Sequence, residues 1–171
     1  MTFNCFDEFE LTEITQLKVG GQKHVYTAAL QGGEKVVLKI INPDQDAQRI
    51  QRELEIAKDC SGFNSPKVID DGTIDCNGVE YLFIIESYIE GSTLKDYIAL
   101  ESPIAYDEVI NFLRAIFNAI KNLEHRRLVH RDIKPDNIIR ATNGEYYLID
   151  FGIARALDQE SLTNTNDPYG P

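Results

Sequence analysis

The stretch HRDIKPDNIIRATNGEYYLIDFG (residues 130–152) decides the architecture of this 171-residue chain. It contains two short polar clusters, HRDIKPDN and DFG, separated by the pair Asn143-Gly144 and an apolar run over residues 146–149. Asn and Gly favour turns because they tolerate backbone conformations that most residues avoid. The carboxylate, amide and ammonium groups of the two polar clusters are the candidates for chemistry.

The order and spacing of these polar residues favour a functional site over a simple loop. Asp, Asn and Pro could serve turn chemistry alone, but turn residues need no fixed order. Here Asn137 follows Asp132 by five residues, and Asp150 follows Asn137 by thirteen. A carboxylate and an amide oxygen are hard ligands of the kind that Mg²⁺ prefers. The pattern therefore favours a phosphoryl-transfer site, in which catalysis is mostly positioning and charge neutralisation.

With these motifs in this order, the sequence resembles the eukaryotic-like serine/threonine protein kinases, in a form that looks bacterial. The resemblance implies that Asp132 accepts the proton of the attacking hydroxyl and that Lys134 assists the moving phosphate. It also implies that Asn137 and Asp150 hold the Mg²⁺ of bound ATP. Lys134 followed by Pro135 favours the serine/threonine type over tyrosine kinases.

Composition and charge exclude several other classes. Apolar residues make up 43% of the chain and charged residues 26%, as in ordinary soluble globular proteins. The net charge of −11 argues against nucleic acid or an anionic membrane as a partner. The sequence shows no basic leader and no apolar stretch of membrane-spanning length, so a cytoplasmic protein is expected. Cys5, Cys60 and Cys76 are scattered, and reduced thiols are expected.

The first part of the chain predicts a small sheet with a glycine-containing turn. Residues 1–16 are acidic with interspersed phenylalanines, and they either lie against the outside of that sheet or fray. Two β-rich runs after residue 17 flank a glycine-rich turn at residues 31–33, which predicts a hairpin. Before it, Gly20 and Gly21 would let backbone N–H groups approach a phosphate.

This turn departs from the family's glycine loop, G-x-G-x-x-G-x-V. With Val25 as the anchor, only Gly20 matches, while Lys18 and Lys23 stand at the first and third glycine positions. The two lysines either replace backbone contacts to phosphate by charge or are simply solvated. The resemblance implies that Gly20, Gly21 and Val25 lie against the nucleotide.

Lys39 interrupts the apolar run VVLKII and needs a nearby anion if it is buried. The resemblance implies that Lys39 binds the α- and β-phosphates of ATP and pairs with a glutamate on the following helix. Residues 45–58 have helical character, and Glu53 stands where that glutamate is due. Two other acids are weaker candidates: Glu55 on a different face, and Asp46 about two turns earlier.

The next segments predict a hairpin and a connection to a second lobe. Asn77-Gly78 is a hairpin turn signal before the apolar residues 79–85. The following ESYIEGSTLKDYI resembles the family's hinge and the first helix of its large lobe. The alignment puts Glu86 at the gatekeeper position. It also implies that backbone groups of Ser87 and Ile89 hydrogen-bond adenine.

Residues 103–128 carry a clear helical period. Their large apolar side chains are predicted to share one broad face: Ile110, Leu113, Phe117, Ile120 and Leu123. The polar residues after DFG resemble an activation segment, in which Arg131 would receive a phosphate. Candidate phosphate acceptors there are Ser161, Thr163 and Thr165.

The expected fold is α+β and protein-kinase-like. An antiparallel small-lobe sheet with one regulatory helix precedes the first, mainly helical part of the large lobe. The expected divisions are an N-terminal extension (residues 1–16), a small lobe (17–86), and a hinge with a partial large lobe (87–171).

The expected function is transfer of the γ-phosphate of Mg-ATP to a hydroxyl of a protein substrate or of the chain itself. The alternative is a nucleotide-binding pseudokinase or regulatory module without turnover, which the degenerate glycine loop would favour. A small-molecule phosphotransferase is disfavoured by the lysine-proline pair and the DFG motif. Because the peptide-supporting helices of the family are not present in these residues, a partner chain or self-association is expected to cover the helix over residues 103–128.

Overall fold

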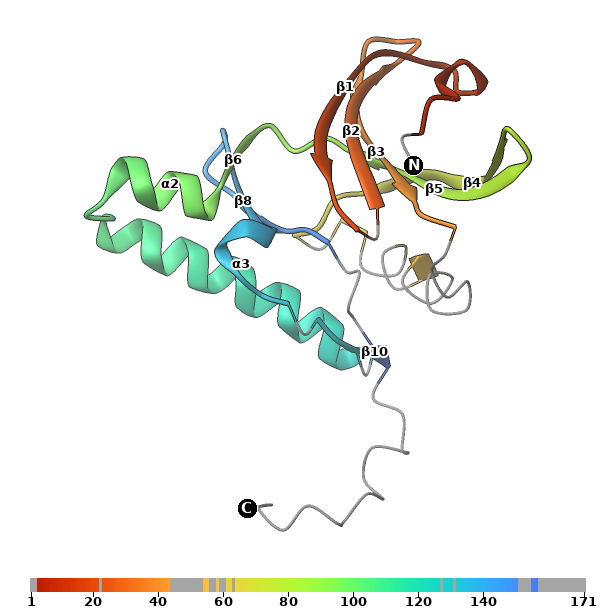
Figure 1. Ribbon diagram of the computed structural model, residues 1–171. Coiled ribbons are helices and arrows are strands. Elements are labelled where there is room, and N and C mark those ends of the chain that lie inside the picture. The colour runs from red at the N-terminus through yellow and green to blue at the C-terminus, as the bar shows by residue number, and fades with distance from the viewer. Residues whose placement is uncertain are drawn as a thin grey trace.

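The computed structural model describes residues 3–21, 23–43, 54–55, 58, 61–62, 64–126, 128–130, 132–150 and 155–156. A curved sheet forms one part of the molecule, and two helices with short strands form the other (Figure 1). This confirms the α+β prediction of a small-lobe sheet followed by a mainly helical part. Within the described ranges, no helix is both long enough and apolar enough to cross a bilayer.

Five antiparallel strands form the sheet in the order β1-β2-β3-β5-β4. Their bounds are β1 (Leu11–Val19), β2 (Lys23–Leu30), β3 (Lys35–Ile41), β4 (Val68–Cys76) and β5 (Val79–Ser87). The turn between β4 and β5 uses Asn77 and Gly78, with φ of 58° and 80°. Both residues are left-handed, as a two-residue hairpin requires, so this prediction is confirmed. Strand β1 begins at Leu11, inside the segment that we expected to precede the small lobe.

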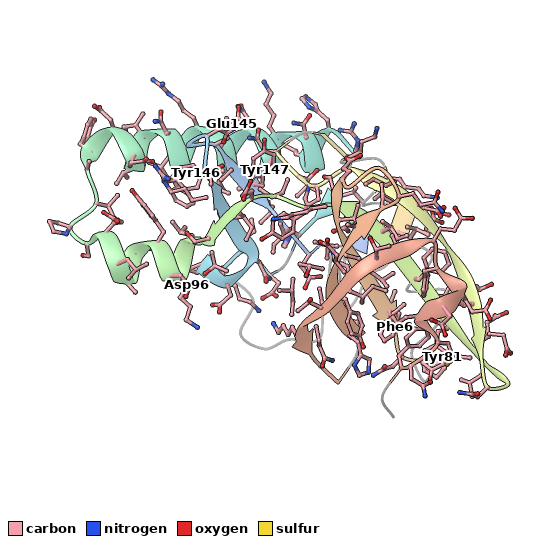
Figure 2. The ribbon with its side chains drawn as sticks, turned by 90° about the horizontal axis from the view of Figure 1, so that it is seen from above. Phe6, Tyr81, Asp96, Glu145, Tyr146 and Tyr147 are labelled. Carbon is pink, nitrogen blue, oxygen red and sulfur yellow. A yellow bond between two sulfur atoms is a disulfide. The ribbon has the colours of Figure 1, made fainter. Side chains whose placement is uncertain are left out.

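The outer face of the sheet is closed by an aromatic segment at the N-terminus. Phe3 is 2% exposed, and η1 (Phe6–Glu8) follows it as a short 3₁₀ turn. The ring of Phe6 packs edge-on against Tyr26 at 4.9 Å between centroids, and Phe3 packs in the same way against Tyr81 at 5.2 Å. Phe6 and Tyr81 lie together at the sheet end of the molecule (Figure 2). Of the two expectations for this segment, packing against the sheet is therefore confirmed.

A disulfide between Cys5 and Cys76 ties this aromatic segment to the end of β4, with 5.6 Å between the Cα atoms. The expectation of reduced thiols is wrong for this pair, and Cys60 lies outside the described residues. The two cysteines are 71 residues apart in sequence, and only the packing of the N-terminal segment brings them together. Disulfides are uncommon in reducing compartments. The cytoplasmic location therefore stays a prediction. The redox state of Cys5 and Cys76 in the cell would test it.

Strand β3 contributes side chains to both faces of the sheet, because successive side chains of a strand point to opposite faces. Val36, Leu38 and Ile40 are fully buried in the aromatic core on the outer side. On the inner side, Ile41 packs with Leu54. Of the helix expected over residues 45–58, the structure describes Leu54, Glu55 and Lys58, all in helical conformation. Glu53 lies outside the described residues.

The second part of the molecule is built around two helices and a three-stranded sheet. Its elements are β6 (Gly91–Thr93), α2 (Leu94–Glu101), α3 (Tyr106–His125), β7 (Leu128–Val129), η2 (Pro135–Asn137), β8 (Ile138–Ala141), β9 (Tyr146–Leu148) and β10 (Arg155–Ala156). The strands pair in the order β6-β8-β9, while β7 pairs with β10. A Cβ on Gly91 would come within 2.1 Å of the Arg140 carbonyl, so the contact of β6 with β8 requires glycine. Thr93 caps α2 by accepting the Asp96 N–H at 3.1 Å.

Helix α3 has two apolar stripes, whereas we predicted one broad face. Ile116, Ala119 and Leu123 are buried, and the first two pack in a core with β8 and β9. Leu113 and Phe117 are 53% and 68% exposed. Residues 113 and 117 are one turn apart, on a different side of the helix from residues 116 and 119. We call the exposed stripe, which consists of Val109, Leu113, Phe117 and Ile120, the outer α3 stripe.

One carboxylate connects α3 to both neighbouring strands. Glu108 accepts hydrogen bonds from Arg140 Nε at 3.2 Å and from the Tyr146 hydroxyl at 2.8 Å. The Arg140 guanidinium also lies 4.4 Å above the ring of Tyr97. Burial and the bond to Glu108 raise the pKa of Tyr146 to about 12. The hydroxyl therefore remains a donor at all ordinary pH values.

We expect Glu108→Ala to lower the free energy of unfolding by about 1–3 kcal/mol, because the hydrogen bonds from Arg140 and Tyr146 to this charged group are lost. The hydrogen bond from Arg140 lowers the pKa of Glu108. The carboxylate therefore contributes its stability above the ordinary glutamic acid range and loses it as pH falls through the lowered pKa. Urea titrations of both proteins at pH 7 and at about pH 3 measure the difference, which should shrink in acid. Glu124→Ala, exposed on the same helix, is the control. An equal loss at both pH values would contradict the assignment.

Candidate active site

A cavity of about 790 Å³ lies between the sheet and the helical part. It is bounded by the turn from β1 to β2, by the inner faces of β3 and β5, by the segment after β5, and by the loops that precede β8 and follow β9. The predicted site residues that line it are Gly20, Gly21, Val25, Lys39, Ser87, Ile89, Asp132, Asn137 and Asp150. Segments more than 100 residues apart in the sequence thus contribute to one site.

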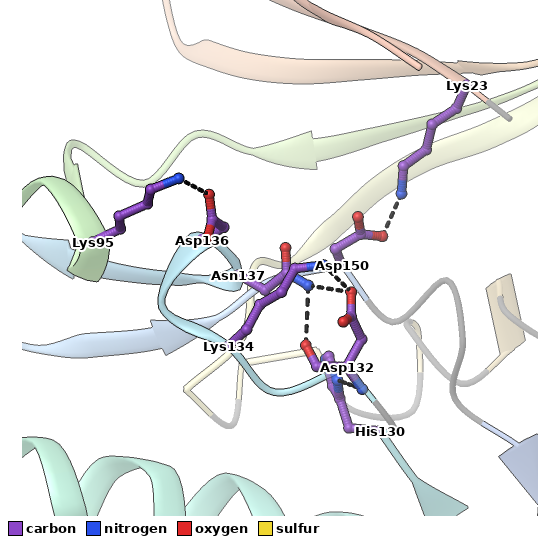
Figure 3. Close-up of polar contacts among 8 residues, drawn as sticks. All are labelled: Lys23, Lys95, His130, Asp132, Lys134, Asp136, Asn137 and Asp150. Atoms are coloured by element: carbon purple, nitrogen blue, oxygen red, sulfur yellow. Dashed lines mark hydrogen bonds and ion pairs between the residues drawn. The ribbon is translucent and has the colours of Figure 1, made fainter. Parts of the chain in front are cut away.

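The loop before β8 is organised by Asn137, which is 6% exposed. Its side-chain amide donates to the Asp132 carbonyl at 3.0 Å and to Asp132 Oδ2 at 2.7 Å (Figure 3). Lys134 Nζ lies 2.7 Å from the same carboxylate oxygen. The hydrogen bonds from Lys134 and Asn137 hold the pKa of Asp132 below its usual range. Asp132 is therefore ionised at neutral pH and held in one orientation.

His130 is buried next to this loop and is hydrogen-bonded to it. It is 2% exposed, and its Nδ1 accepts the backbone N–H of Asp132 at 3.3 Å. Burial lowers the pKa of His130. A neutral ring with Nδ1 free of a proton is what this hydrogen bond requires. His130 therefore has a structural role in holding this loop.

Asp150 follows β9 with a left-handed φ of 66°. The N–H of the preceding residue, Ile149, donates to the Asn137 carbonyl at 2.9 Å. This bond connects the segment that carries Asp150 to the loop that carries Asp132. The two polar clusters of residues 130–152 therefore lie next to each other.

Lys23, the first residue of β2, forms an ion pair with Asp150 across the cavity (Figure 3). The sequence left two alternatives for Lys23, a phosphate contact or a solvated side chain. The side chain is 26% exposed and paired with Asp150, so it is not simply solvated, and its contact with phosphate stays a prediction. Burial and the nearby Lys39 lower the pKa of Lys23, and Asp150 opposes this effect.

Lys39 pairs with Glu86 on the neighbouring strand, with 2.6 Å between Nζ and Oε2. The two side chains are only 12% and 8% exposed. Burial alone would lower the pKa of Lys39, but Glu86 and Asp150 outweigh it and the pKa is raised. The sequence analysis placed Glu86 at the gatekeeper position but did not predict its ion pair with Lys39. A signal for this pair was present, since each residue is a charge next to a run of apolar residues in its strand.

Apolar side chains line the part of the cavity next to the segment after β5. Val25 and Val37 come from the sheet, while Ile139 and Ile149 come from the helical part. The N–H of Ser87 donates to the Lys67 carbonyl at 2.8 Å. Any hydrogen bond from the Ser87 backbone to a ligand must therefore use its carbonyl. An apolar slot edged by backbone polar groups suits a flat heterocycle.

The donor set fits a magnesium ion. The Asn137 amide hydrogens point to Asp132, which leaves the amide oxygen as a hard ligand beside the Asp150 carboxylate. In the part of the chain that the structure describes, no group of three or more His, Cys, Asp or Glu side chains gathers as in a dense metal cage. Mg²⁺ is usually held by one or two protein oxygens together with water and phosphate.

Comparisons with known proteins agree with this geometry. The family model described as "Protein kinase domain" matches residues 11–168. The probable serine/threonine-protein kinase PknB of Lactococcus lactis is 32% identical over 164 residues, or 92% of this chain and 26% of that protein. The serine/threonine-protein kinase PrkC of Bacillus subtilis is 34% identical over 157 residues, or 88% of this chain and 24% of that protein. The chain thus spans about a quarter of the length of these relatives. Since the family model covers most of its residues, the chain belongs to the protein kinase family.

Proposed function

We propose that this chain binds Mg-ATP and transfers the γ-phosphate to a serine or threonine hydroxyl. The observation that carries the proposal is the convergence of Lys39, Asp132, Asn137 and Asp150 on one cavity. Its relatives are named as serine/threonine protein kinases, which supports the acceptor class. The acceptor would lie on a protein substrate or on the chain itself.

The adenine would occupy the apolar slot between Val25 and Val37 on one side and Ile139 and Ile149 on the other. The backbone of Ser87 and Ile89 lines the same slot and would hydrogen-bond the edge of the base. Because these contacts come from the backbone, they depend little on which side chains are present.

The triphosphate would extend toward Lys39 and the turn that holds Gly20 and Gly21. Lys39 would bind phosphate oxygens by charge. Asn137 and Asp150 would hold Mg²⁺, which when bound would neutralise phosphate charge during transfer. To do so, Asp150 must exchange its ion pair with Lys23 for the metal.

Asp132 would orient the attacking hydroxyl and accept its proton. Its lowered pKa makes it a weak base, so its main contribution would be to hold the hydroxyl in line with the phosphate. Lys134, which holds the Asp132 carboxylate, would also offer positive charge to the phosphate in transfer.

The pseudokinase alternative rested on the degenerate glycine loop. We do not favour it, because Lys39, Asp132, Asn137 and Asp150 all line the cavity. The candidate phosphate acceptors Ser161, Thr163 and Thr165, and Arg131, which would receive the phosphate, lie outside the described residues. Their roles stay predictions.

We expect Asp150→Ala to abolish the dependence of ATP binding on Mg²⁺. Calorimetric titration of ATP into the protein, with Mg²⁺ and with EDTA, measures this dependence. Wild type should bind more tightly with Mg²⁺, whereas the variant should bind equally with and without it. Asp75→Ala, on β4 and outside the cavity, is the control. If Asp150→Ala kept the full Mg²⁺ effect, the metal assignment would be wrong.

We expect Asp132→Asn to reduce phosphotransfer at least about a hundredfold, the lower end for a positioned general base. ATP affinity should stay nearly unchanged, because Asp132 acts on the acceptor hydroxyl only as transfer occurs. The measurement is autophosphorylation with radiolabelled ATP, next to calorimetry of ATP binding. Robust autophosphorylation by the variant would refute the role.

We further propose that the outer α3 stripe is covered by self-association when residues 1–171 are expressed alone. Burial of one large apolar side chain contributes roughly 1.5–3 kcal/mol, and four such residues lie together on this stripe. Analytical ultracentrifugation should find species larger than a monomer. Phe117→Asp should shift the distribution to monomer, whereas Lys121→Asp, exposed on the same helix, should not. A wild-type chain that is a stable monomer would contradict this proposal.

A further inference from the structure

The geometry of strands β3 and β5 places Lys39 and Glu86 on the same face of the sheet. Val37 lies opposite Glu86, and Lys39 lies opposite Ile84, two residues further along. Lys39 and Glu86 are therefore diagonal neighbours across an antiparallel pair, within reach of long side chains. Both line the cavity, and their charged atoms are 2.6 Å apart.

The Glu86 carboxylate is the anion that balances Lys39 where water has little access. With side-chain exposures of 12% and 8%, neither charge is solvated as it would be on a surface. Removing one partner of such a pair leaves an uncompensated buried charge, which is strongly unfavourable. The other charged groups that act on Lys39 are Asp150, after β9, and Lys23, on β2. Asp150 is itself engaged by Lys23.

We propose that Glu86 is a positioning residue for ATP binding, which acts by holding the Lys39 ammonium toward the phosphates from a sheet strand. This inference rests on the proposed function. In the family pattern, this lysine is oriented by a glutamate on a helix, for which the sequence predicts Glu53, a residue outside the described ranges. Strand β5 is hydrogen-bonded on both sides, to β3 and to β4. An anchor on β5 therefore keeps Lys39 in place whatever the position of the helix.

The same contact could act in the opposite sense, by holding Lys39 away from the phosphates. The two possibilities differ in sign. If Glu86 positions Lys39, its neutralisation weakens ATP binding. If Glu86 restrains Lys39, its neutralisation strengthens binding. A merely structural role would change stability but would not depend on whether Lys39 is present.

The test is a double-mutant cycle on Mg-ATP affinity, measured by calorimetry on the 171-residue chain, with circular dichroism as a check of folding. We expect Glu86→Gln to weaken binding about tenfold, because the amide oxygen keeps an acceptor but attracts the Lys39 ammonium less strongly than a carboxylate does. In a Lys39→Ala background, the same substitution should have no further effect, because Glu86 acts through Lys39. Glu80→Gln is the matched control, since it removes one exposed charge from the same strand.

The outcomes separate this inference from the proposed function. If wild type does not bind Mg-ATP, the proposed function fails. If wild type binds and Lys39→Ala weakens binding, but Glu86→Gln leaves it unchanged or tighter, the positioning role is overturned. Equal effects of Glu86→Gln with and without Lys39 also overturn it. Should Glu86→Gln fail to fold, Glu86→Asp decides. It keeps the charge but withdraws it by one methylene, so binding should weaken several-fold, and wild-type affinity would overturn the role.

Discussion

The buried side chain of Asn137 is the contact on which the geometry of the site depends. Its side-chain amide donates to both the backbone carbonyl and the carboxylate of Asp132, and the backbone carbonyl of the same residue accepts the N–H of Ile149. One residue therefore sets the position of the base candidate and of the segment that ends in Asp150. Because Asn137 is 6% exposed, water competes little for these bonds. Asn137 thus brings two motifs that are separated in the sequence, HRDIKPDN and DFG, next to each other.

The sheet contributes to the site through the alternation of one strand. In β3, Val36, Leu38 and Ile40 are anchored in the aromatic core, and this fixes the opposite direction for Val37 and Lys39. The N-terminal segment matters here although it is far from the cavity, because Phe3 and Phe6 complete that core. A shift of one residue in the register of β3 would turn Lys39 into the apolar core. The packing of β3 against the aromatic core therefore also determines that Lys39 points into the cavity.

The sequence predicted those parts of the structure that depend on local spacing or on ordered motifs. The α+β class and the Asn77-Gly78 hairpin follow from the family resemblance and from turn chemistry. The resemblance also singled out Lys39, Asp132, Asn137 and Asp150, which line one cavity, while their roles stay predictions. The Cys5–Cys76 disulfide and the Lys39–Glu86 pair were missed because each joins residues brought together only by sheet register or by long-range packing. The sequence analysis predicted one apolar face where α3 has two stripes. Periodicity indicates which residues share a side of a helix, but not which neighbouring elements cover them.

Lys23 stands where the family's glycine loop has its third glycine, and it also forms one of the two ion pairs in the cavity. Lys23 pairs with Asp150 and Lys39 pairs with Glu86, so the charges cancel within these two ion pairs. A divalent cation at Asp150 would compete with Lys23, because two cations at one carboxylate repel each other. The released ammonium lies on the strand that begins beside Gly20 and Gly21, the segment proposed to meet the triphosphate. A side-chain cation there supplies attraction to phosphate that backbone N–H groups supply in a glycine-rich loop. The loss of glycines is therefore compatible with phosphate binding, at the cost of a rearrangement at Asp150 that a glycine loop does not need.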